Sequence, residues 1–219
     1  MVSSGSDGLD GAWVGESTRA RRRRATRRHI AETAMSLFET KGYPTTTVDE
    51  IAVACDIGRR TFFRYFQAKE ELLYPFLEES LAIVAAVLRR SSDVPPFAAV
   101  RAGFAEVAAV FERDAEFHLR CGAVATLQHG EERSVTEVPR PVLNDLAFQR
   151  TEHDIAALMQ VDAATDPRPT LITGTAVTVF ASAYVEWLGH GAGVSLTELL
   201  EQRFATLFEL LNAGSDAGV

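Results

Sequence analysis

Apolar residues recur along most of the chain at intervals of three and four positions, the spacing of a helix that buries one face. In the stretch 45–73, for example, Val48, Ile51, Ala52 and Cys55 fall at i, i+3, i+4 and i+7. No strand-like alternation and no internal repeat is visible, so the pattern predicts an all-α fold. It predicts a first helix ending at 41, then helices over 48–55, 59–66, 69–90, 97–113, 114–128, 139–160, 170–188 and 195–212.

The stretch 45–73 has the signals of two short helices joined by a tight turn. Thr47 is placed to cap the first helix, and Glu50 at the third helical position completes a capping box. The sequence Asp56-Ile57-Gly58 then breaks the helix, because glycine permits the backbone geometry of a sharp turn and Ile57 can fill the angle between the helices. The stretch therefore predicts a helix-turn-helix unit.

The second helix of this unit has an apolar inner face and a basic outer one. Phe62 and Phe66 lie four residues apart and are expected to point inward. The outer faces carry Arg59, Arg60, Thr61, Phe63, Arg64 and Tyr65. A short helix with arginines outside suits the DNA major groove, where arginine donates two hydrogen bonds to guanine. The alternative is a solvated, arginine-rich helix in an ordinary bundle, because many helix-turn-helix units bind no DNA.

The segment 27–73 resembles the N-terminal DNA-binding domain of the tetracycline-repressor (TetR) family of bacterial regulators. The matching positions are Arg27, Ile30, Ala34, Leu37-Phe38, Gly42-Tyr43, Thr47-Val48, Ile51-Ala52, Cys55-Asp56-Ile57-Gly58, Thr61, Phe63, Tyr65-Phe66, Lys69-Glu70 and Leu72-Leu73. The resemblance implies an N-terminal three-helix helix-turn-helix domain, a C-terminal helical bundle for ligand binding and dimerisation, and a homodimer on a double-stranded DNA operator. It also implies that Lys69 binds a backbone phosphate, and we expect the same of Thr46, Thr47 and Tyr65.

Three positions depart from the family's pattern. Gly58 replaces a serine, which removes one hydroxyl available for capping or phosphate contact. Arg60 replaces a glycine and adds a long cation at the groove, while Phe63 replaces a tyrosine and keeps only the ability to touch a thymine methyl. The departures alter the expected DNA contacts but leave the helix-turn-helix pattern intact.

Net charge divides the chain into a basic head and an acidic body. Residues 17–68 carry eleven Lys and Arg against five Asp and Glu, whereas residues 69–219 carry eleven against 22. A basic head attracts phosphates, and an acidic body discourages DNA from wrapping around the rest. We expect a disordered tail over 1–18, a helix-turn-helix domain over 19–68 and a ligand-binding and dimerisation domain over 69–219.

A run of arginines precedes the helix-turn-helix unit. It includes Arg21, Arg22, Arg23 and Arg24. Beside such a unit we favour an arm that enters the minor groove or follows the phosphates. The alternative is a solvated start to the first helix.

Other chemistry has weaker support. His118 and Cys121 share a helix face, but a zinc site usually has four well-spaced ligands, so we expect no metal and no cofactor. No catalytic motif nominates a nucleophile or base, which argues against an enzyme. The apolar stretch 170–188 fails as a membrane span on its length and its Thr, Ser and Gly content. The cysteine usage and the lack of an apolar signal core suggest a cytoplasmic protein, associated with the nucleoid when bound to DNA.

The acidic body offers a dimer interface and a candidate pocket. The helices expected over 170–188 and 195–212 carry more apolar surface than one core can hide, which predicts a homodimer through these helices; alternatively both are simply core. Mostly apolar walls with a few polar groups are typical of a small-molecule site. The expected pocket residues are Phe104, Val107, Phe111, His118, Cys121, Phe148, Glu152, Thr173, Phe180 and Tyr184. The alternative is a filled core in which these rings touch.

Three functions remain open. The first, which we favour, is a dimeric repressor that binds a palindromic operator and is released by a small, largely apolar effector. The second is a DNA-binding regulator of the same fold that has no ligand and is controlled by a protein partner. The third is a helical enzyme with a vestigial N-terminal domain.

Overall fold

The structure, a computed structural model, describes residues 17–129, 145–191 and 193–215. These residues are mostly helical and include no strand, so the all-α prediction is confirmed. The expected tail lies outside the described residues as far as residue 16, as does the start of the helix expected from 139.

The chain forms two units. Its helices are α1 (Thr18–Lys41), α2 (Val48–Ala54), α3 (Arg59–Phe62), the 3₁₀ helix η2 (Lys69–Leu73), α4 (Leu77–Arg89), α5 (Pro96–Arg113), α6 (Ala115–His129), α7 (Asp145–Met159), α8 (Arg168–Gly189) and α9 (Leu196–Ser215). We call Met1–Leu77 with Glu116–Val142 the head unit, and Glu78–Ala115 with Leu143–Val219 the body unit. This division differs from the expected boundary at residue 69, because side chains of both η2 and α6 pack into the core of the head unit.

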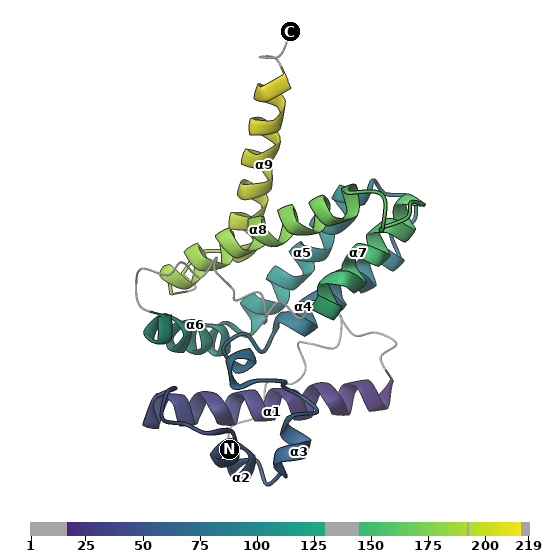
Figure 1. Cartoon of the computed structure of the whole chain (residues 1–219). Helices are drawn as coiled ribbons and strands as arrows, with labels where there is room; N and C mark the ends of the chain where they lie inside the picture. The colour runs from purple at the N-terminus through teal and green to yellow at the C-terminus, as the bar shows by residue number, and fades with distance from the viewer. Residues whose placement is uncertain (1–16, 130–144, 192, 216–219) are drawn as a thin grey trace. The chain divides into compact units, whose positions relative to one another are not determined.

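In the head unit, α1 packs against α2 and η2, and α2 packs against α3 (Figure 1). Ile30 and Ala34 of α1, which match the family pattern, are fully buried. Phe62 and Phe66 reach the same core from α3 and the turn after it, and Phe117 reaches it from α6. Burial of these large apolar side chains fixes α3 on the surface of the unit.

Helix α3, the second helix of the helix-turn-helix unit, is shorter than its apolar pattern predicts. It ends at Phe62 rather than Phe66. Beyond it the chain continues in tighter turns, with Arg64 N donating to Thr61 O at 3.1 Å and Tyr65 N to Phe62 O at 2.8 Å. Such hydrogen bonds between residues three apart are typical of helix ends. Phe66 is still buried, as the spacing predicts.

The prediction of a single helix over 69–90 is wrong. The structure has η2 first and starts α4 only at Leu77, with Tyr74, Pro75 and Phe76 between them. Proline lacks the N–H of a helical hydrogen bond and disfavours helical geometry in the residue before it. Tyr74 accordingly has φ −133° and ψ 52°.

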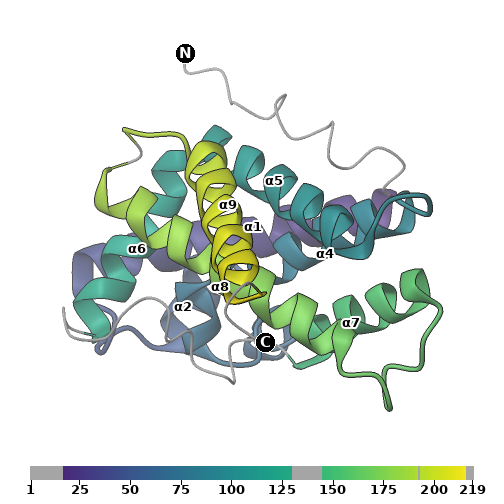
Figure 2. The same cartoon turned by 90° about the horizontal axis from the view of Figure 1, so that it is seen from above.

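In the body unit, α8 packs against α5, α7 and α9, and Figures 1 and 2 show α7 and α8 side by side. The crossing of α4 and α5 is close at Gly103, where a Cβ atom would lie 3.1 Å from Val84 Cα. The start of α9 is fixed by a side-chain cap, because the Ser195 hydroxyl accepts from Glu198 N at 3.2 Å. Glu112 of α5 accepts from Thr197 N at 3.0 Å and ties the two helices together.

Helix α8 extends the stretch 170–188 to 22 residues and is long and apolar enough to cross a membrane by length and composition alone, so these two grounds against a membrane span are wrong. No other described helix passes this test. Its buried side chains include Thr173, Phe180 and Trp187, which face the other helices of the body unit. Only 33% of its most apolar window is buried, so α8 also presents apolar surface that the described residues do not cover.

Candidate nucleic-acid interface

The capping box that starts α2 is confirmed. The Thr47 hydroxyl accepts from Glu50 N at 3.2 Å, and the Glu50 carboxylate accepts from Thr47 N at 2.9 Å. A hydrogen bond from the Lys41 ammonium, followed by those from Thr47, lowers the pKa of Glu50 to about 2. The end of α1 is thereby joined to the start of α2.

The turn between α2 and α3 uses a different residue from the one expected. Asp56 has φ 53°, in the left-handed region, whereas Gly58 has φ −76° and caps α3. Aspartate tolerates this geometry because its short polar side chain makes local hydrogen bonds. Ile57 packs half-buried against the head-unit core, as the pattern predicts.

The outward side chains of α3 and the turn after it form the candidate base-reading surface. Arg59, Arg60, Phe63 and Arg64 are exposed. Thr61 and Tyr65 are half-buried. Tyr65 packs against the core of the head unit.

Arg59 is held by an acidic side chain from the neighbouring helix. Its Nη1 donates to both carboxylate oxygens of Asp49 in α2, at 3.2 and 3.1 Å. The guanidinium carbon also lies 5.6 Å from the centre of the Phe63 ring. The sequence pattern alone indicates no role for Asp49, because only the angle between α2 and α3 brings this side chain to Arg59.

A second arginine, Arg27, supports the turn after α3 from its inner side. Arg27 of α1 donates to the main-chain oxygen of Tyr65, and through Nε to that of Pro75 at 3.4 Å. Its guanidinium also lies 4.0 Å from the centre of the Phe66 ring. These contacts fix the turn after α3 against α1. The only sequence signal for this role was the position of Arg27 in the family pattern.

Two residues expected to hold phosphates make internal hydrogen bonds. Lys69 donates to the main-chain oxygens of Tyr43 at 2.8 Å and Thr46 at 3.0 Å. Thr46 is buried, and its hydroxyl donates to Gly42 O at 2.8 Å. Both residues therefore brace the connection between α1 and α2.

The arginine run forms the first turns of α1 instead of an extended arm. Helix α1 begins at Thr18, where the Ser17 hydroxyl caps it by accepting from Ala20 N at 3.2 Å. Arg21, Arg22 and Arg23 are exposed, and Arg24 is half-buried. The described chain thus follows the alternative of a helical start, and it presents the arginines on a rigid element.

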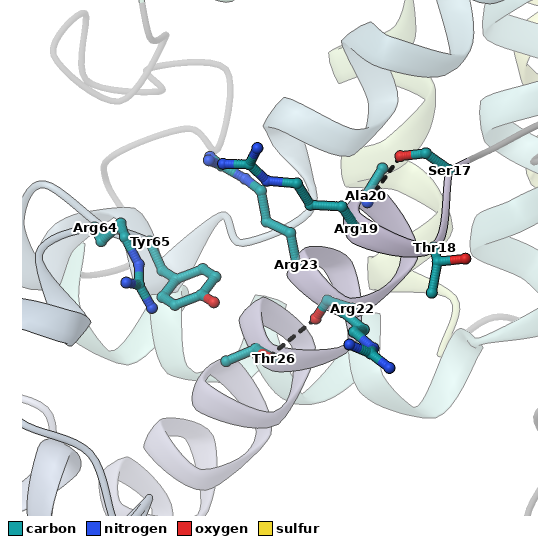
Figure 3. A pocket seen from close by; sticks show the side chains of 9 residues that line it. All are labelled: Ser17, Thr18, Arg19, Ala20, Arg22, Arg23, Thr26, Arg64 and Tyr65. Atoms are coloured by element: carbon teal, nitrogen blue, oxygen red, sulfur yellow. Dashed lines mark hydrogen bonds between the residues drawn. The ribbon is translucent and has the colours of Figure 1, made fainter.

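These first turns and the segment after α3 enclose an open hollow of about 760 Å³. Figure 3 shows the arginines of α1 on one side and Arg64 with Tyr65 on the other. The lining residues are Ser17, Thr18, Arg19, Ala20, Arg22, Arg23, Thr26, Arg64 and Tyr65, which include no acidic residue. Four guanidinium groups around one opening suit a phosphate, which accepts hydrogen bonds from arginine.

The ten residues expected to line an effector pocket fall into both units. Phe104, Phe111, Phe180 and Tyr184 form one buried aromatic cluster in the body unit, with ring centres 5.3 to 6.1 Å apart. Val107 is buried on the same helix as two of these rings, and Thr173 is buried on α8. Phe148 and Glu152 are half-buried on α7.

His118 and Cys121 instead belong to the head unit, because the apolar face of α6 packs into that core. The His118 ring lies 4.8 Å from the Phe76 ring, centre to centre. Burial, and then the nearby charge of Arg28, lower the pKa of His118 to about 3. The imidazole is therefore neutral at physiological pH and serves as a packing group. Arg120 on the same helix pairs with Glu39 of α1 at 2.7 Å.

Comparisons with known proteins agree with this geometry. The family described as bacterial regulatory proteins, tetR family, matches residues 30–74. The transcriptional regulator TcmR of Streptomyces glaucescens is 32% identical over 79% of this chain and 77% of its own length. MftR of Mycobacterium tuberculosis, named as a regulator of mycofactocin biosynthesis, is 28% identical over 92% of this chain and 96% of its own length.

A solved structure is similar over most of both chains. Thermus thermophilus FadR, a TetR-family transcriptional repressor in complex with lauroyl-CoA, has 25% sequence identity and a TM-score of 0.50, and the match covers 84% of this chain and 93% of that one. These relatives are named as transcriptional regulators, not enzymes. The chain belongs to the tetR family of bacterial regulatory proteins and is a DNA-binding transcriptional regulator.

Proposed function

We propose that the protein is a homodimeric repressor that binds a palindromic operator and leaves it when a small, largely apolar effector binds the body unit. The observation that carries this proposal is the helix-turn-helix of the head unit, which turns Arg59, Arg60 and Arg64 outward and places Arg64 beside the arginines of α1. It acts on DNA in the cytoplasm.

We assign base reading to α3 and phosphate contacts to the residues around it. Arg59, Arg60, Thr61 and Arg64 would meet base edges, because arginine and threonine both donate to bases in the major groove. Thr47, Tyr65 and the α1 arginines would hold the backbone and set the register. Lys69 and Thr46 would support these contacts by bracing the chain before α2.

The apolar surface at the end of the body unit supports a homodimer. Helix α9 continues past α8 without a neighbouring helix in Figure 1. In the last turns of α9, Leu210 and Leu211 are 68% and 60% exposed. Phe208 is 40% exposed, although its ring centre lies 5.4 Å from that of Phe97 in α5. Leu171 of α8 is 63% exposed. Pairing α8 and α9 with their copies would bury these side chains in an interface of four helices.

Replacing Leu210 and Leu211 with glutamate is expected to separate the dimer, because like charges would meet on an apolar interface. Sedimentation of the unaltered protein at micromolar concentration should give twice the chain mass of 23.9 kDa, and the variant should give a single chain. Val94→Glu is the control, since Val94 is 42% exposed in the connection between α4 and α5. A monomeric unaltered protein would contradict the proposal.

Support for the effector is less direct and leaves a second candidate. FadR of Thermus thermophilus is described with lauroyl-CoA, which carries an apolar acyl chain. The body unit offers apolar walls in the cluster of Phe104, Phe111, Phe180 and Tyr184. Because these rings touch one another, they also fit a filled core. That contact favours the alternative in which a protein partner, and not a ligand, controls DNA binding.

Lauroyl-CoA at a hundred times its dissociation constant is expected to stabilise the native protein by about 2.7 kcal/mol. It should raise the melting temperature and release the operator, whereas coenzyme A alone should do neither. Val107→Trp puts a much larger side chain beside the aromatic cluster and should remove the response, while Val53→Trp, at a position 79% exposed in α2, should keep it. If acyl-CoA esters of several chain lengths all leave the melting temperature and operator binding unchanged, the protein-partner alternative replaces the ligand.

A further inference from the structure

We propose that Asp49 is a specificity-determining residue, which positions Arg59 so that this arginine reads one guanine in each half of the operator. The inference rests on the proposed function, in which α3 meets base edges. It adds a residue of α2 that carries the opposite charge from the arginines expected to touch DNA.

The ion pair with Asp49 leaves the guanine-binding edge of Arg59 available. Asp49 takes both of its hydrogen bonds from a single nitrogen, Nη1, at 3.2 and 3.1 Å. Arginine meets guanine O6 and N7 with two parallel N–H groups. Nε and Nη2 can supply these two groups while Nη1 stays on the carboxylate. Asp49 thus occupies the nitrogen that this mode of recognition does not need.

Arg59 is also restrained from a second side. The Phe63 ring centre lies 5.6 Å from its guanidinium carbon, and Phe63 is itself exposed beside it. Arg60 differs: within the described part of the chain it has no ion-pair or ring partner. The two adjacent arginines therefore meet DNA in different states, with Arg59 oriented in advance and Arg60 free to adapt. Orientation before binding reduces the entropy lost when the contact forms.

The pair adds little to folding, which makes a purely structural role a weak explanation. Its side chains are 65% and 63% exposed, and ion pairs in water at such exposure contribute little to stability. An acidic side chain close to DNA also lowers the affinity for every sequence, because it opposes the phosphates. Asp49 thus lowers the affinity for DNA and adds little to the stability of the fold. Its presence is explained if it improves the discrimination between bases.

Selection of bound sequences from a random DNA pool tests the proposal. The variants are Asp49→Asn, Arg59→Ala, their combination, and Asp56→Asn. The last is the matched control, because it removes the same charge from the same unit, and asparagine tolerates the φ of 53° found at Asp56. Base preference compares sequences bound by the same folded protein, so a loss of stability does not imitate the expected result.

We expect Arg59→Ala to reduce the preference for guanine at one position of each half-site about tenfold. Asp49→Asn should lower the same preference about threefold or more, with no further effect when Arg59 is already alanine. Both Asn variants should raise the affinity for unrelated DNA to a similar degree, and Asp56→Asn should keep the preference.

Two results distinguish a failure of the positioning role of Asp49 from a failure of the proposed function. If Arg59→Ala loses the preference but Asp49→Asn keeps it as Asp56→Asn does, Asp49 has no positioning role and the inference is overturned. If Arg59→Ala, Arg60→Ala and Arg64→Ala all keep the base preferences of the unaltered protein, α3 is not the reading element and the proposed function fails with it.

Discussion

Replacing Phe62 with alanine is expected to lower the free energy of unfolding of the head unit by about 3–5 kcal/mol. The Phe62 side chain is fully buried, and its ring centre lies 5.8 Å from that of Phe66 and 5.4 Å from that of Phe63. Its removal leaves a cavity beneath α3 and costs a large part of the 5–15 kcal/mol that typically stabilises a domain. Because Arg59 and Arg60 stand on the same short helix, operator binding should be lost as well.

Phe63→Ala is the matched control for this prediction. It makes the same chemical change one residue away, at a side chain that is 42% exposed. Denaturant unfolding should show a change within about 0.5 kcal/mol for this variant. Equal destabilisation by the two substitutions, or normal operator binding by Phe62→Ala, would show that Phe62 does not hold α3 in place.

Replacing Arg19, Arg22 and Arg23 with alanine is expected to weaken DNA binding about tenfold or more at physiological salt. All three side chains line the hollow shared with Arg64. The slope of log affinity against log salt should fall by about one for each phosphate contact removed. Alanine has the highest helix propensity, so α1 itself should stay helical.

A triple variant of the body unit controls for net charge. Arg89, Arg113 and Arg150 are exposed there, and their replacement by alanine removes the same three charges. This control should bind DNA with nearly the same affinity and salt slope as the unaltered protein. If both triple variants lose affinity equally, the effect comes from total charge, and the hollow has no particular role.

Local sequence signals predicted the elements that depend on neighbouring residues. The capping box of Thr47 and Glu50 forms as expected, and helical spacing identified Phe62 and Phe66 as core. The pattern failed where one residue overrides periodicity, as Pro75 does between η2 and α4. An apolar stripe shows which face of a helix is buried but not which unit covers it. For that reason α6 was assigned to the body, and His118 with it.

The side-chain partners at the candidate site could not be predicted in this way. The Asp49–Arg59 pair joins residues ten positions apart, and it depends on the turn geometry that Asp56 sets with its positive φ. Lys69 had a family role in phosphate binding, but its ammonium reaches the carbonyls of Tyr43 and Thr46, which lie on a distant part of the chain. Such contacts follow from the packing of several helices, and spacing within one helix carries no information about them.

Footprinting on the DNA upstream of the protein's own gene tests the central claim most directly, namely that two head units place α3 in the major groove of a palindromic site. We expect two protected half-sites that are related by two-fold symmetry. Their centres should be separated by one helical turn, about 34–36 Å, or a multiple of it. Replacing Arg59, Arg60 and Arg64 together with alanine should remove this protection. Protection that is asymmetric, or that persists in the triple variant, would contradict the account.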